Sequence, residues 1–455
     1  MPTITNKTTK PLSVPLPGGK TVHLGPKASG QVSPRAAEHA PLQKLVEAGA
    51  LAVVAGGAGG GQAVGGGAKG QGYAQGGPVQ GRGSPRRGDR CGRRGAAGGA
   101  TGTLSDVDSA AMDHHQQFDA LLRGPAPLLA LAPMQDVTDL PFWRLMAAYG
   151  GADVNYTEYF RVHATSNLEP WIVEAIEKNP TGRPVVAQMI GNDIPSLLRT
   201  ARQLQQLPVA AIDLNLGCPA PVVYRKCAGG GLLREPQRVD AILGALRQAV
   251  QVKFTVKTRL GFDSAAGFDD LLAIFARHSL DLLTVHGRTV TEMYRSPVHY
   301  DDIARAAAAV PCPVLANGNV HSAAHAAAVL AMTGARGLMI GRGAIRNPWL
   351  FTQIRQHQRG AALFVPRGRD VLGYVRELYR LTMPPAGRAP AQVQKMKRYM
   401  NHLGVGVEPT GRFLHEIRRV ASEPDFFRVC DEYLDHDRAM PLEPFPAAHA
   451  ETDGA

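Results

Sequence analysis

The chain has 455 residues, with 50 lysines and arginines against 38 aspartates and glutamates, a formal net charge of +12 at pH 7. This length allows two or three domains with large cores, so a small disulfide-stapled class of protein is excluded. The five cysteines are too few and too irregularly spaced for a disulfide framework or a zinc site, which favours a reducing compartment. Without a secretory pattern or an apolar run long enough to span a bilayer, the sequence predicts a cytoplasmic protein with no membrane partner. The positive charge suggests a polyanionic partner.

The first 126 residues divide into two parts of different composition. Residues 1–55 contain short apolar runs separated by turn residues, which predict a hairpin around Gly18-Gly19, a helix over 41–50 and a small β-rich unit. Residues 56–126 are predicted to be a low-complexity linker rich in glycine, alanine and arginine. Its part up to about residue 102 lacks apolar periodicity and is predicted to be disordered, so the N-terminal extension is mostly disordered. Within it, residues 81–95 hold six arginines and one aspartate. They are interpreted as a solvated linker, with a nonspecific RNA-binding arm as the alternative.

Short apolar runs alternate with longer helical segments from residue 127 onward. The predicted strands are Leu128–Ala132, Asp153–Glu158, Pro184–Ile190, Val209–Asn215, Val252–Thr258, Leu280–His286, Pro313–Asn317 and Gly337–Gly341. Helical spacing lies between them, for example at 194–206, 239–248, 267–277 and 323–332. Eight strand–helix units favour an α/β fold of the (β/α)8 TIM-barrel type over residues 127–360. A doubly wound sheet is the alternative, but it requires a glycine-rich turn where Pro133-Met134-Gln135 stands.

The predicted strands stop after about residue 355, and helical runs follow at 370–382, 391–403, 411–421 and 424–434. This pattern predicts a small all-α bundle over residues 361–440, followed by a tail over 441–455. Residues 388–419 carry seven lysines and arginines against two glutamates. The basic run indicates either an RNA-binding face or simply a solvated helix surface.

The turn after the fourth strand carries the strongest chemical signal. In a TIM barrel, catalytic groups lie at the carboxyl ends of the strands. Cys218 follows the fourth strand within Gly217-Cys218-Pro219, where a thiol can point into a pocket, so Cys218 is a candidate catalytic residue. The alternative is an inert, small apolar side chain. Cys227, just before a glycine run, is a candidate second thiol.

Other strand ends supply groups suited to a flat, electron-rich ligand. Met134 is able to face a ring, and the amide of Gln188 can donate and accept hydrogen bonds at once. Lys257 and Arg259 share one face of the fifth strand by the period of two, and with His286 they form a clamp for a ring or an anion. Core packing is the alternative for Met134, Gln188 and His286.

The last two strand ends predict a phosphate site. Asn317-Gly318-Asn319 follows the seventh strand and Gly341-Arg342 follows the eighth. Glycine loops at these two positions of a TIM barrel bind phosphate through backbone N–H groups, and Arg342 adds a charge-assisted hydrogen bond. The residues alone therefore predict a barrel that binds a flat, phosphorylated cofactor beside a cysteine.

Together these segments resemble the tRNA-dihydrouridine synthase family. The similar segments are Ala132-Pro133-Met134, Val186–Met189, Asn215–Pro219, Val256–Gly261, His286–Thr289, Asn317–Asn319 and Ile340–Gly343, and the likeness runs from about residue 127 to 435. The resemblance implies an FMN-dependent enzyme that uses NADPH to reduce the C5–C6 double bond of particular uridines in tRNA. It also implies that the helical domain binds tRNA, so Lys395, Lys397 and Arg398 are expected to contact its phosphates.

The resemblance implies a role for each matching residue. Cys218 is implied as the catalytic acid, with Asn215 and Arg259 placed to meet the substrate. The implied FMN-binding residues are Pro133, Met134, Gln135, Gln188, Lys257, His286, Asn317, Gly318, Asn319, Gly341 and Arg342. Gln135 and Asn319 are mild departures from the residues that the family commonly has. Two alternatives remain open: an FMN barrel acting on a small molecule of the dihydroorotate or enoate type, and a noncatalytic tRNA-binding derivative.

Overall fold

The structure is a computed structural model, and it describes residues 2–9, 12–17, 20–54, 113–383 and 389–445. The chain divides into two compact units, Met1–Thr103 and Leu104–Ala455. The segment 81–95 and most of the predicted linker lie outside the described residues, as does the predicted tail from residue 446.

In its described residues, the N-terminal unit consists of short strands and two helices. Strand β1 (Thr3–Asn6) pairs antiparallel with β4 (Ser29–Gln31) and with β5 (Leu51–Val54), while β2 (Leu12–Leu16) and β3 (Lys20–Leu24) form a hairpin. The hairpin lies where the sequence predicts one, although Gly18 and Gly19 themselves are outside the described residues. Helices α1 (Pro34–Ala37) and α2 (Ala40–Glu47) lie between β4 and β5 in the sequence. Its core includes Ile4, Val14, Leu42 and Leu51.

The second unit contains a closed barrel, which confirms the predicted (β/α)8 fold. In the described part of this unit, eight parallel strands close into a ring through the pairing of β9 with β10. They are β6 (Leu128–Leu131), β7 (Val154–Tyr156), β9 (Val185–Ile190), β10 (Ala211–Leu216), β11 (Lys253–Arg259), β12 (Leu282–His286), β13 (Val314–Asn317) and β14 (Gly337–Ile340). A two-residue strand, β8 (Phe160–Arg161), pairs with the end of β9 and was not predicted.

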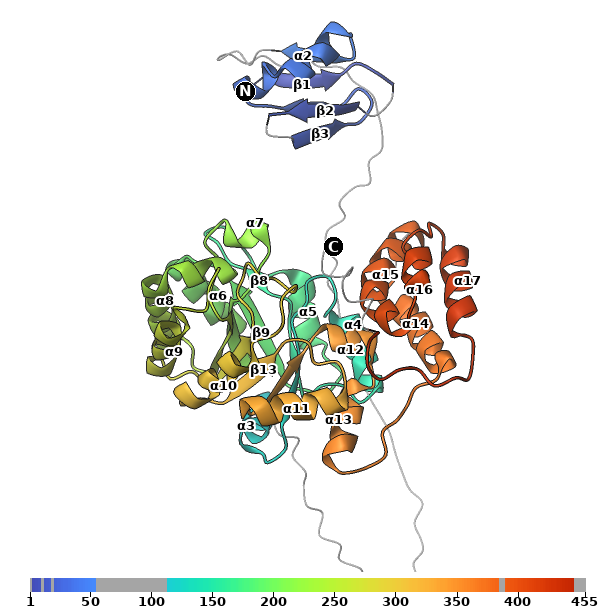
Figure 1. Cartoon of the computed structure of the whole chain (residues 1–455). Coiled ribbons are helices and arrows are strands. Elements are labelled where there is room, and N and C mark those ends of the chain that lie inside the picture. Colours follow the sequence, from blue (N-terminus) through green and yellow to red (C-terminus); the bar gives the residue numbers. More distant parts are fainter. Residues whose placement is uncertain (1, 10–11, 18–19, 55–112, 384–388, 446–455) are drawn as a thin grey trace, which may run out of the picture. The chain divides into compact units, whose positions relative to one another are not determined.

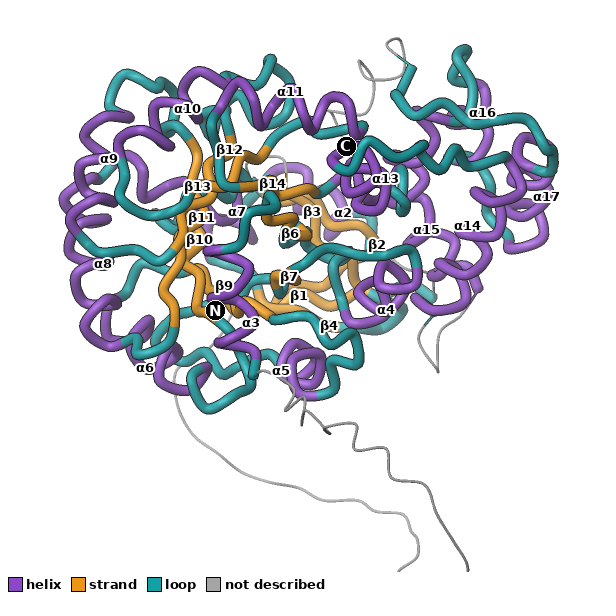
Figure 2. Tube along the Cα trace, turned by 90° about the horizontal axis from the view of Figure 1, so that it is seen from below, coloured by secondary structure: helices purple, strands orange, loops and turns teal. Residues whose placement is uncertain are grey.

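Helices surround the strands, as Figure 2 shows from below the view of Figure 1. They are α4 (Leu140–Ala148), α5 (Pro170–Glu177), α6 (Ile194–Leu204), α8 (Pro236–Ala249), α9 (Phe268–Arg277), α10 (Tyr300–Ala309), α11 (Ala323–Thr333) and α13 (Leu350–Gln358). Helix α6 illustrates why they form: Asp193 caps its first turn through Ser196 N–H, and Leu197, Ala201 and Leu204 bury one stripe against the strands. Short helices α7 (Pro221–Tyr224), η1 (Gly229–Arg234) and α12 (Arg342–Arg346) follow strand ends.

Helix α3 (His114–Arg123) corrects the predicted boundary of the low-complexity linker, which was placed at residue 126. Phe118 and Leu122 pack among the inward residues of the barrel, including Leu128, Val154 and Leu282. Arg336 fixes the end of the helix by donating to the carbonyls of Leu121, Leu122, Gly124 and Ala126. Leu128, Val154 and Leu282 are the first residues of β6, β7 and β12. Helix α3 therefore closes the barrel at the end opposite the carboxyl ends of the strands.

The four predicted C-terminal helices are present beside the barrel (Figure 1). They are α14 (Gly368–Thr382), α15 (Ala389–Leu403), α16 (Arg412–Ile417) and α17 (Glu423–Leu434), with the short helix η2 (Gly404–Gly406) after α15. Tyr399 of α15 stacks on Phe142 of α4 with ring centroids 6.0 Å apart, and Tyr374 donates to the carbonyl of Ile345 at 3.0 Å. The bundle is therefore packed onto the barrel through buried aromatic side chains.

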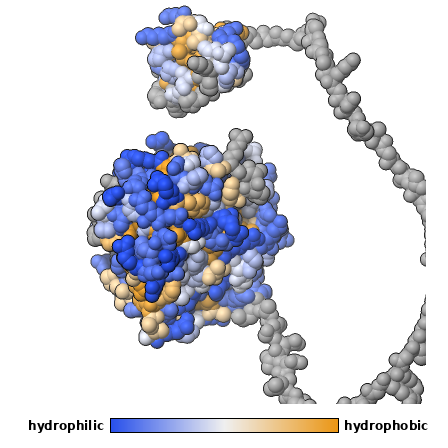
Figure 3. Space-filling model, turned by 90° about the vertical axis from the view of Figure 1, so that its right-hand side faces the viewer, coloured by the Kyte–Doolittle hydropathy of each residue, from blue (hydrophilic) through white to orange (hydrophobic). Residues whose placement is uncertain are grey.

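The surface carries no large apolar area on the face that Figure 3 presents, which is mostly hydrophilic with small, separate apolar areas. None of the described helices is long and apolar enough to cross a bilayer.

Candidate active site at the mouth of the barrel

The turn that carries Cys218 is held by side chains of the barrel itself. The amide oxygen of Asn215 accepts hydrogen bonds from the N–H groups of Gly217 and Cys218 at 3.0 and 2.9 Å. The Cys218 carbonyl accepts from Gly230 N–H at 3.2 Å. Gly229 lies in the left-handed region (φ +54°), and a Cβ there would lie 3.0 Å from the Cβ of Cys218. Glycine at 229 therefore permits the backbone to press against the cysteine, which is half-buried.

Arg259 holds the same turn from the neighbouring strand. Its Nε donates to the Gly217 carbonyl at 2.9 Å, and its Nη1 donates to the carbonyls of Thr289 and Met293 at 2.8 and 2.7 Å. The side chain is buried. The sequence predicted that Asn215 and Arg259 meet the substrate; the structure gives both of them partners in the protein, and a substrate contact stays a prediction.

A buried polar layer lies one step deeper in the barrel. Register places Gln188, Asp213 and Thr255 side by side on β9, β10 and β11. Asp213 accepts from the Gln188 amide at 2.7 Å and from the Thr255 hydroxyl at 2.6 Å, and the Gln188 oxygen accepts from Asn215 at 2.8 Å. Burial raises the pKa of Asp213 to about 6, although these hydrogen bonds oppose the rise. Asp213 was not predicted as a site residue. Gln188 keeps one N–H and one lone pair for the predicted flavin contact.

Lys257 stands above this layer as a half-buried cation. Burial lowers the pKa of Lys257 to about 8, and the nearby Arg259 guanidinium adds to the shift. Among the described residues Lys257 makes no hydrogen bond, and the Asp213 carboxylate and Cys218 act on it only electrostatically and oppose the fall of its pKa. A desolvated cation in this position is costly unless a ligand meets it, so its surroundings fit an anionic or electron-rich group.

His286 is held as a neutral imidazole. Its Nδ1 lies 3.0 Å from the Asn317 amide oxygen, while the Asn317 nitrogen donates to the Met339 carbonyl at 2.7 Å. Because that oxygen can only accept, Nδ1 carries the proton and Nε2 is an acceptor facing Arg288 at 3.3 Å. Burial and the cations around it, Arg259 first among them, lower the pKa of His286 well below its usual value.

The predicted phosphate loops lie together at the ends of β13 and β14. Gly318 (φ +133°) and Asn319 (φ +48°) turn the chain, and the Asn319 oxygen accepts from Arg342 at 3.2 Å. The Arg342 guanidinium also lies 4.6 Å from the ring centroid of Tyr294. A Cβ on Gly341 would lie 3.1 Å from the Met134 sulfur, so glycine lets the first and eighth strand ends approach each other.

The remaining predicted groups are spread around this mouth. Pro133 is half-buried and Gln135 is exposed in the loop after β6. Cys227 is also half-buried, with a positive φ of 51°, and its thiol is free.

Glu158 and Tyr159, at the end of β7, are functional candidates to which the sequence assigned no role. The Glu158 carboxyl is buried, and its Oε2 has no hydrogen-bond partner among the described residues. Burial raises the pKa of Glu158 to about 7, and Asp136 and Asp139 contribute repulsion. A carboxyl group directly after a buried strand was the available signal.

The Glu158→Gln change is expected to remove a pH dependence of stability. The pKa of Glu158 is about 7 in the folded protein against an ordinary 4.5, so the folded state retains a proton that the unfolded state releases between these values. Stability therefore falls as pH rises through this window and levels off above it, a loss of up to about 3 kcal/mol that the amide avoids. Urea titrations of both proteins at pH 5 and 8 measure this difference. Asp213 is present in both proteins, so its contribution to the pH dependence cancels in the comparison. An equal change in free energy of unfolding between pH 5 and pH 8 for the two proteins would contradict the raised pKa of Glu158.

Two of the three predicted tRNA contacts are paired with the barrel. Lys395 lies 3.2 Å from a carboxylate oxygen of Asp139, and Arg398 lies 2.8 Å from Asp136. Lys397 is half-buried, and no ion pair of it is recorded within the described residues. Because both carboxylates belong to the loop after β6, this face of α15 lies next to the barrel mouth, and contact with RNA stays a prediction.

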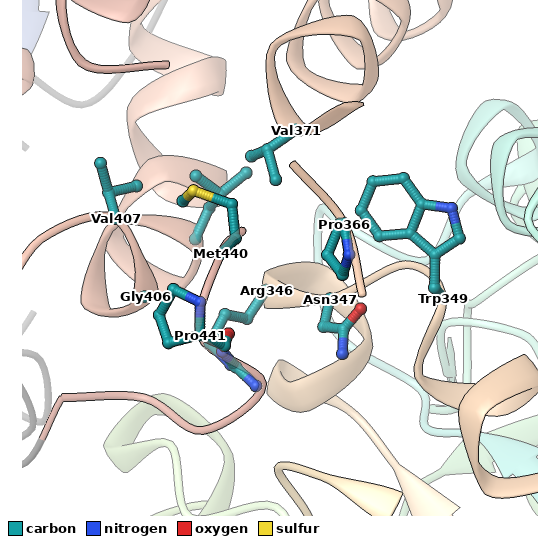
Figure 4. Close-up of a pocket in the computed structure, with 10 residues that line it drawn as sticks. Arg346, Asn347, Trp349, Pro366, Val371, Gly406, Val407, Met440 and Pro441 are labelled. Carbon is teal, nitrogen blue, oxygen red and sulfur yellow. The ribbon is translucent and has the colours of Figure 1, made fainter. Parts of the chain in front are cut away.

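Figure 4 shows a cavity between α12 and the bundle, and its lining contains none of the predicted site residues. Its lining includes Arg346, Asn347, Val407 and Met440. Arg346 donates to the carbonyls of His321 at 2.8 Å and Pro441 at 3.4 Å, and also to that of Leu442. The cavity is thus a joint between barrel and C-terminal segment rather than part of the cysteine site.

Comparison with known proteins shows which family the chain is similar to. The sequence profile of the family described as dihydrouridine synthase matches residues 130–431. A tRNA-dihydrouridine(16) synthase of Neisseria meningitidis serogroup A is 28% identical over 313 residues, covering 67% of this chain and 94% of the relative. A tRNA-dihydrouridine(16) synthase of Cupriavidus necator is 38% identical over 237 residues, covering 50% and 73%. A tRNA-dihydrouridine synthase B of Pseudomonas syringae pv. tomato is 37% identical over 238 residues, covering 50% and 68%. The chain belongs to the dihydrouridine synthase family of enzymes.

Proposed function

We propose that this enzyme reduces the C5–C6 double bond of specific uridines in tRNA, with FMN as cofactor, NADPH as reductant and Cys218 as proton donor. The observation that carries the proposal is the Cys218 turn, which Asn215 and Arg259 hold at the barrel mouth beside Lys257. We also propose that the reaction takes place in the cytoplasm, in keeping with the free thiols of Cys218, Cys227, Cys312 and Cys430.

The residues at the mouth fit a bound FMN. Among the described residues Lys257 is near the Asp213 carboxylate and the Cys218 thiol but makes no hydrogen bond, and Arg342 and Asn319 meet at the predicted phosphate loops. Lys257 and His286 would contact the flavin and its ribityl phosphate region, and the second N–H of Gln188 would reach the pyrimidine edge. Pro133, Met134 and Gln135 would line the ring, while Asn317, Gly318, Asn319, Gly341 and Arg342 would hold the phosphate. When bound and reduced, FMN supplies the hydride for C6 of uracil.

Cys218 completes the reduction by giving its proton to C5. The S–H bond breaks, the C5–H bond forms and the electron pair stays on sulfur as a thiolate. Lys257 and Arg259 both act electrostatically on Cys218, so they stabilise that thiolate as it forms. Water then returns the proton.

The helical bundle is proposed to bind tRNA while the target uridine enters the barrel. A base within folded RNA is out of reach of a recessed thiol, so it has to swing out of its stack. Helix α15 contacts the loop after β6 through Lys395 and Arg398, so a backbone bound on that helix lies close to the mouth.

An assay with defined components tests the proposal. The purified full chain is incubated with FMN, NADPH and an unmodified tRNA transcript, and nucleosides are analysed by mass spectrometry. We expect dihydrouridine to appear only with all components, and sequencing of the reduced positions then identifies the target. Reduction of free pyrimidines or enoates without any reduction of tRNA would instead favour a small-molecule oxidoreductase, and tRNA binding without a flavin spectrum would favour a noncatalytic protein.

Replacing Lys395, Lys397 and Arg398 together with alanine is expected to weaken tRNA binding and its salt dependence. If each cation neutralises one phosphate, the plot of the logarithm of the tRNA association constant against log salt concentration should become less steep by about 2. Filter binding over a salt series measures it.

The matched control replaces Arg369, Arg376 and Arg380 of α14, which are exposed and paired with carboxylates of the same bundle. This control removes the same charge, so its slope should stay closer to that of the unchanged protein. Equal losses for both triple variants would show a general charge effect and would remove α15 from the proposed interface.

A further inference from the structure

A continuous chain of hydrogen bonds runs from the Cys218 turn into the interior of the barrel. The N–H groups of Gly217 and Cys218 donate to the Asn215 oxygen at 3.0 and 2.9 Å. The Asn215 amide nitrogen donates to the Gln188 oxygen at 2.8 Å, and the Gln188 nitrogen donates to Asp213 at 2.7 Å. Every donor in this chain therefore points away from the turn and toward the Asp213 carboxylate.

The direction of the chain is fixed at both ends. Backbone N–H groups can only donate, so the oxygen of Asn215 has to face the turn and its nitrogen has to face Gln188. At the other end an ionised carboxylate can only accept, so it requires the nitrogen of Gln188. An inverted Gln188 amide would set its oxygen against Asp213 and its nitrogen against the Asn215 nitrogen, and both hydrogen bonds would be lost.

Asp213 is fully buried, and it receives a donor on each of its two oxygens. The second donor is the hydroxyl of Thr255, at 2.6 Å. Lys257 on the same strand as Thr255 is the cation that acts electrostatically on this carboxylate. Because bulk water does not reach a fully buried group, a donor that loses this acceptor has no replacement for it. The carboxylate therefore holds the side chains around it in one arrangement.

We propose that Asp213 is a positioning residue, whose carboxylate fixes the orientation of the Gln188 amide. Through Asn215, the same chain of hydrogen bonds holds the turn that presents Cys218. The inference rests on the proposed function, in which Gln188 contacts the flavin and Cys218 is the acid. An oriented Gln188 offers a bound ring one N–H and one lone pair in a fixed arrangement, which suits the pyrimidine edge of a flavin. Asp213 acts on that ring only through Gln188.

The test compares two replacements of Asp213 in the full chain. Leucine has the branched shape of aspartate but gives Gln188 no acceptor, whereas asparagine keeps one oxygen for Gln188 and turns its NH2 group toward the Thr255 hydroxyl, which can accept. We expect Asp213→Leu to raise the dissociation constant of FMN about tenfold, measured by quenching of flavin fluorescence. Asp213→Asn should stay within about twofold of the unchanged protein.

The second readout is the rate of iodoacetamide labelling at each cysteine, resolved by mass spectrometry. In Asp213→Leu the turn opens more often, so the rate at Cys218 should rise about fivefold relative to Cys227 of the same molecules. In Asp213→Asn the ratio of the two rates should stay within about twofold of its value in the unchanged protein. A merely structural loss would change the two thiols alike.

A double-variant cycle measures whether Asp213 acts through Gln188. Gln188→Met breaks the chain at its middle, so by itself it should raise the labelling rate of Cys218 to a similar extent. Adding Asp213→Leu should then change the rate less than about twofold, whereas effects that multiply would contradict the inference. If leucine at position 213 prevents folding, Asp213→Ser takes its place in both arms, because serine is polar but too short to reach Gln188.

The control is Thr284→Val, because Thr284 is also buried on a barrel strand and takes no part in this chain of hydrogen bonds. It should leave both readouts at the values of the unchanged protein. Unchanged FMN affinity and Cys218 labelling in Asp213→Leu would overturn the inference. Equal damage by asparagine and leucine would overturn it too, since the role would then belong to the charge.

The labelling result is independent of the proposed reaction, because it needs neither tRNA nor NADPH. If the unchanged protein reduces no tRNA, the proposed function fails. The labelling rates of the Asp213 variants still decide whether this carboxylate positions the Cys218 turn.

Discussion

Replacing Cys218 with alanine is expected to abolish dihydrouridine formation while leaving FMN binding intact. The alanine removes the only proposed proton donor to C5, and general acid catalysis of this kind contributes about 10²–10⁴-fold to a rate. The Asn215 and Gly230 bonds to the turn involve backbone atoms of residue 218, so the turn should keep its shape. Single-turnover reduction of tRNA by photoreduced enzyme measures the chemical step, and the flavin spectrum measures occupancy.

Two controls separate the thiol from its surroundings. Cys227→Ala removes the other half-buried thiol near the glycine run and should retain activity. NADPH oxidation by Cys218→Ala, followed without tRNA, should equal that of the unchanged enzyme. Dihydrouridine formation at an undiminished rate would exclude Cys218 as the acid, and loss of flavin would point to a structural role for it.

Replacing Arg259 with methionine is expected to reduce both stability and activity. It leaves the carbonyls of Gly217, Thr289 and Met293 without their donor in a buried place, which costs about 2–4 kcal/mol in free energy of unfolding. The Gly217 turn also loses its anchor, and a displacement of about 1 Å at a catalytic group lowers a rate by on the order of 10²-fold. Denaturant titration followed by tryptophan fluorescence measures the loss of stability, because Trp143, Trp171 and Trp349 all lie in the second unit, which contains the barrel.

Arg305→Met is the matched control on α10, where the guanidinium is exposed and pairs with Asp269 and Asp302. Ion pairs on the surface contribute little to stability, so this substitution should change the free energy of unfolding by less than about 1 kcal/mol. Arg259→Lys keeps a cation without the planar fork and should recover only part of the loss. Equal denaturation midpoints for Arg259→Met and the unchanged protein would show that the three carbonyls do not depend on Arg259.

The barrel strands could be predicted because each is a short apolar run that ends at a polar or turn residue. The sequence did not reveal helix α3, because its first four residues are polar and its buried contacts come from Phe118 and Leu122. Such a helix has little local signal, because its stability comes from covering the barrel end.

The sequence indicated which residues lie at the candidate site, but it did not indicate which residues they contact. Strand ends indicated Cys218, Lys257, His286 and the two glycine loops. The Gln188–Asp213 hydrogen bond depends on the register between strands, and two of the three carbonyls that Arg259 binds lie on a loop 30 to 34 residues away. The pairing of Arg398 with Asp136 joins residues 262 positions apart. Periodicity within a strand or helix contains no information about contacts of this kind.

The hydrogen bonds of Arg336 have a consequence for synthesis on the ribosome. This arginine follows Leu122, whose carbonyl it binds, by 214 residues. At about 5–20 residues translated per second, α3 leaves the ribosome roughly 10–40 s before Arg336 is available to it. Most of the strands that Phe118 and Leu122 cover are made in the same interval. The first helix of the barrel is therefore one of the last elements to be secured, and until then its apolar side chains are exposed to chaperones.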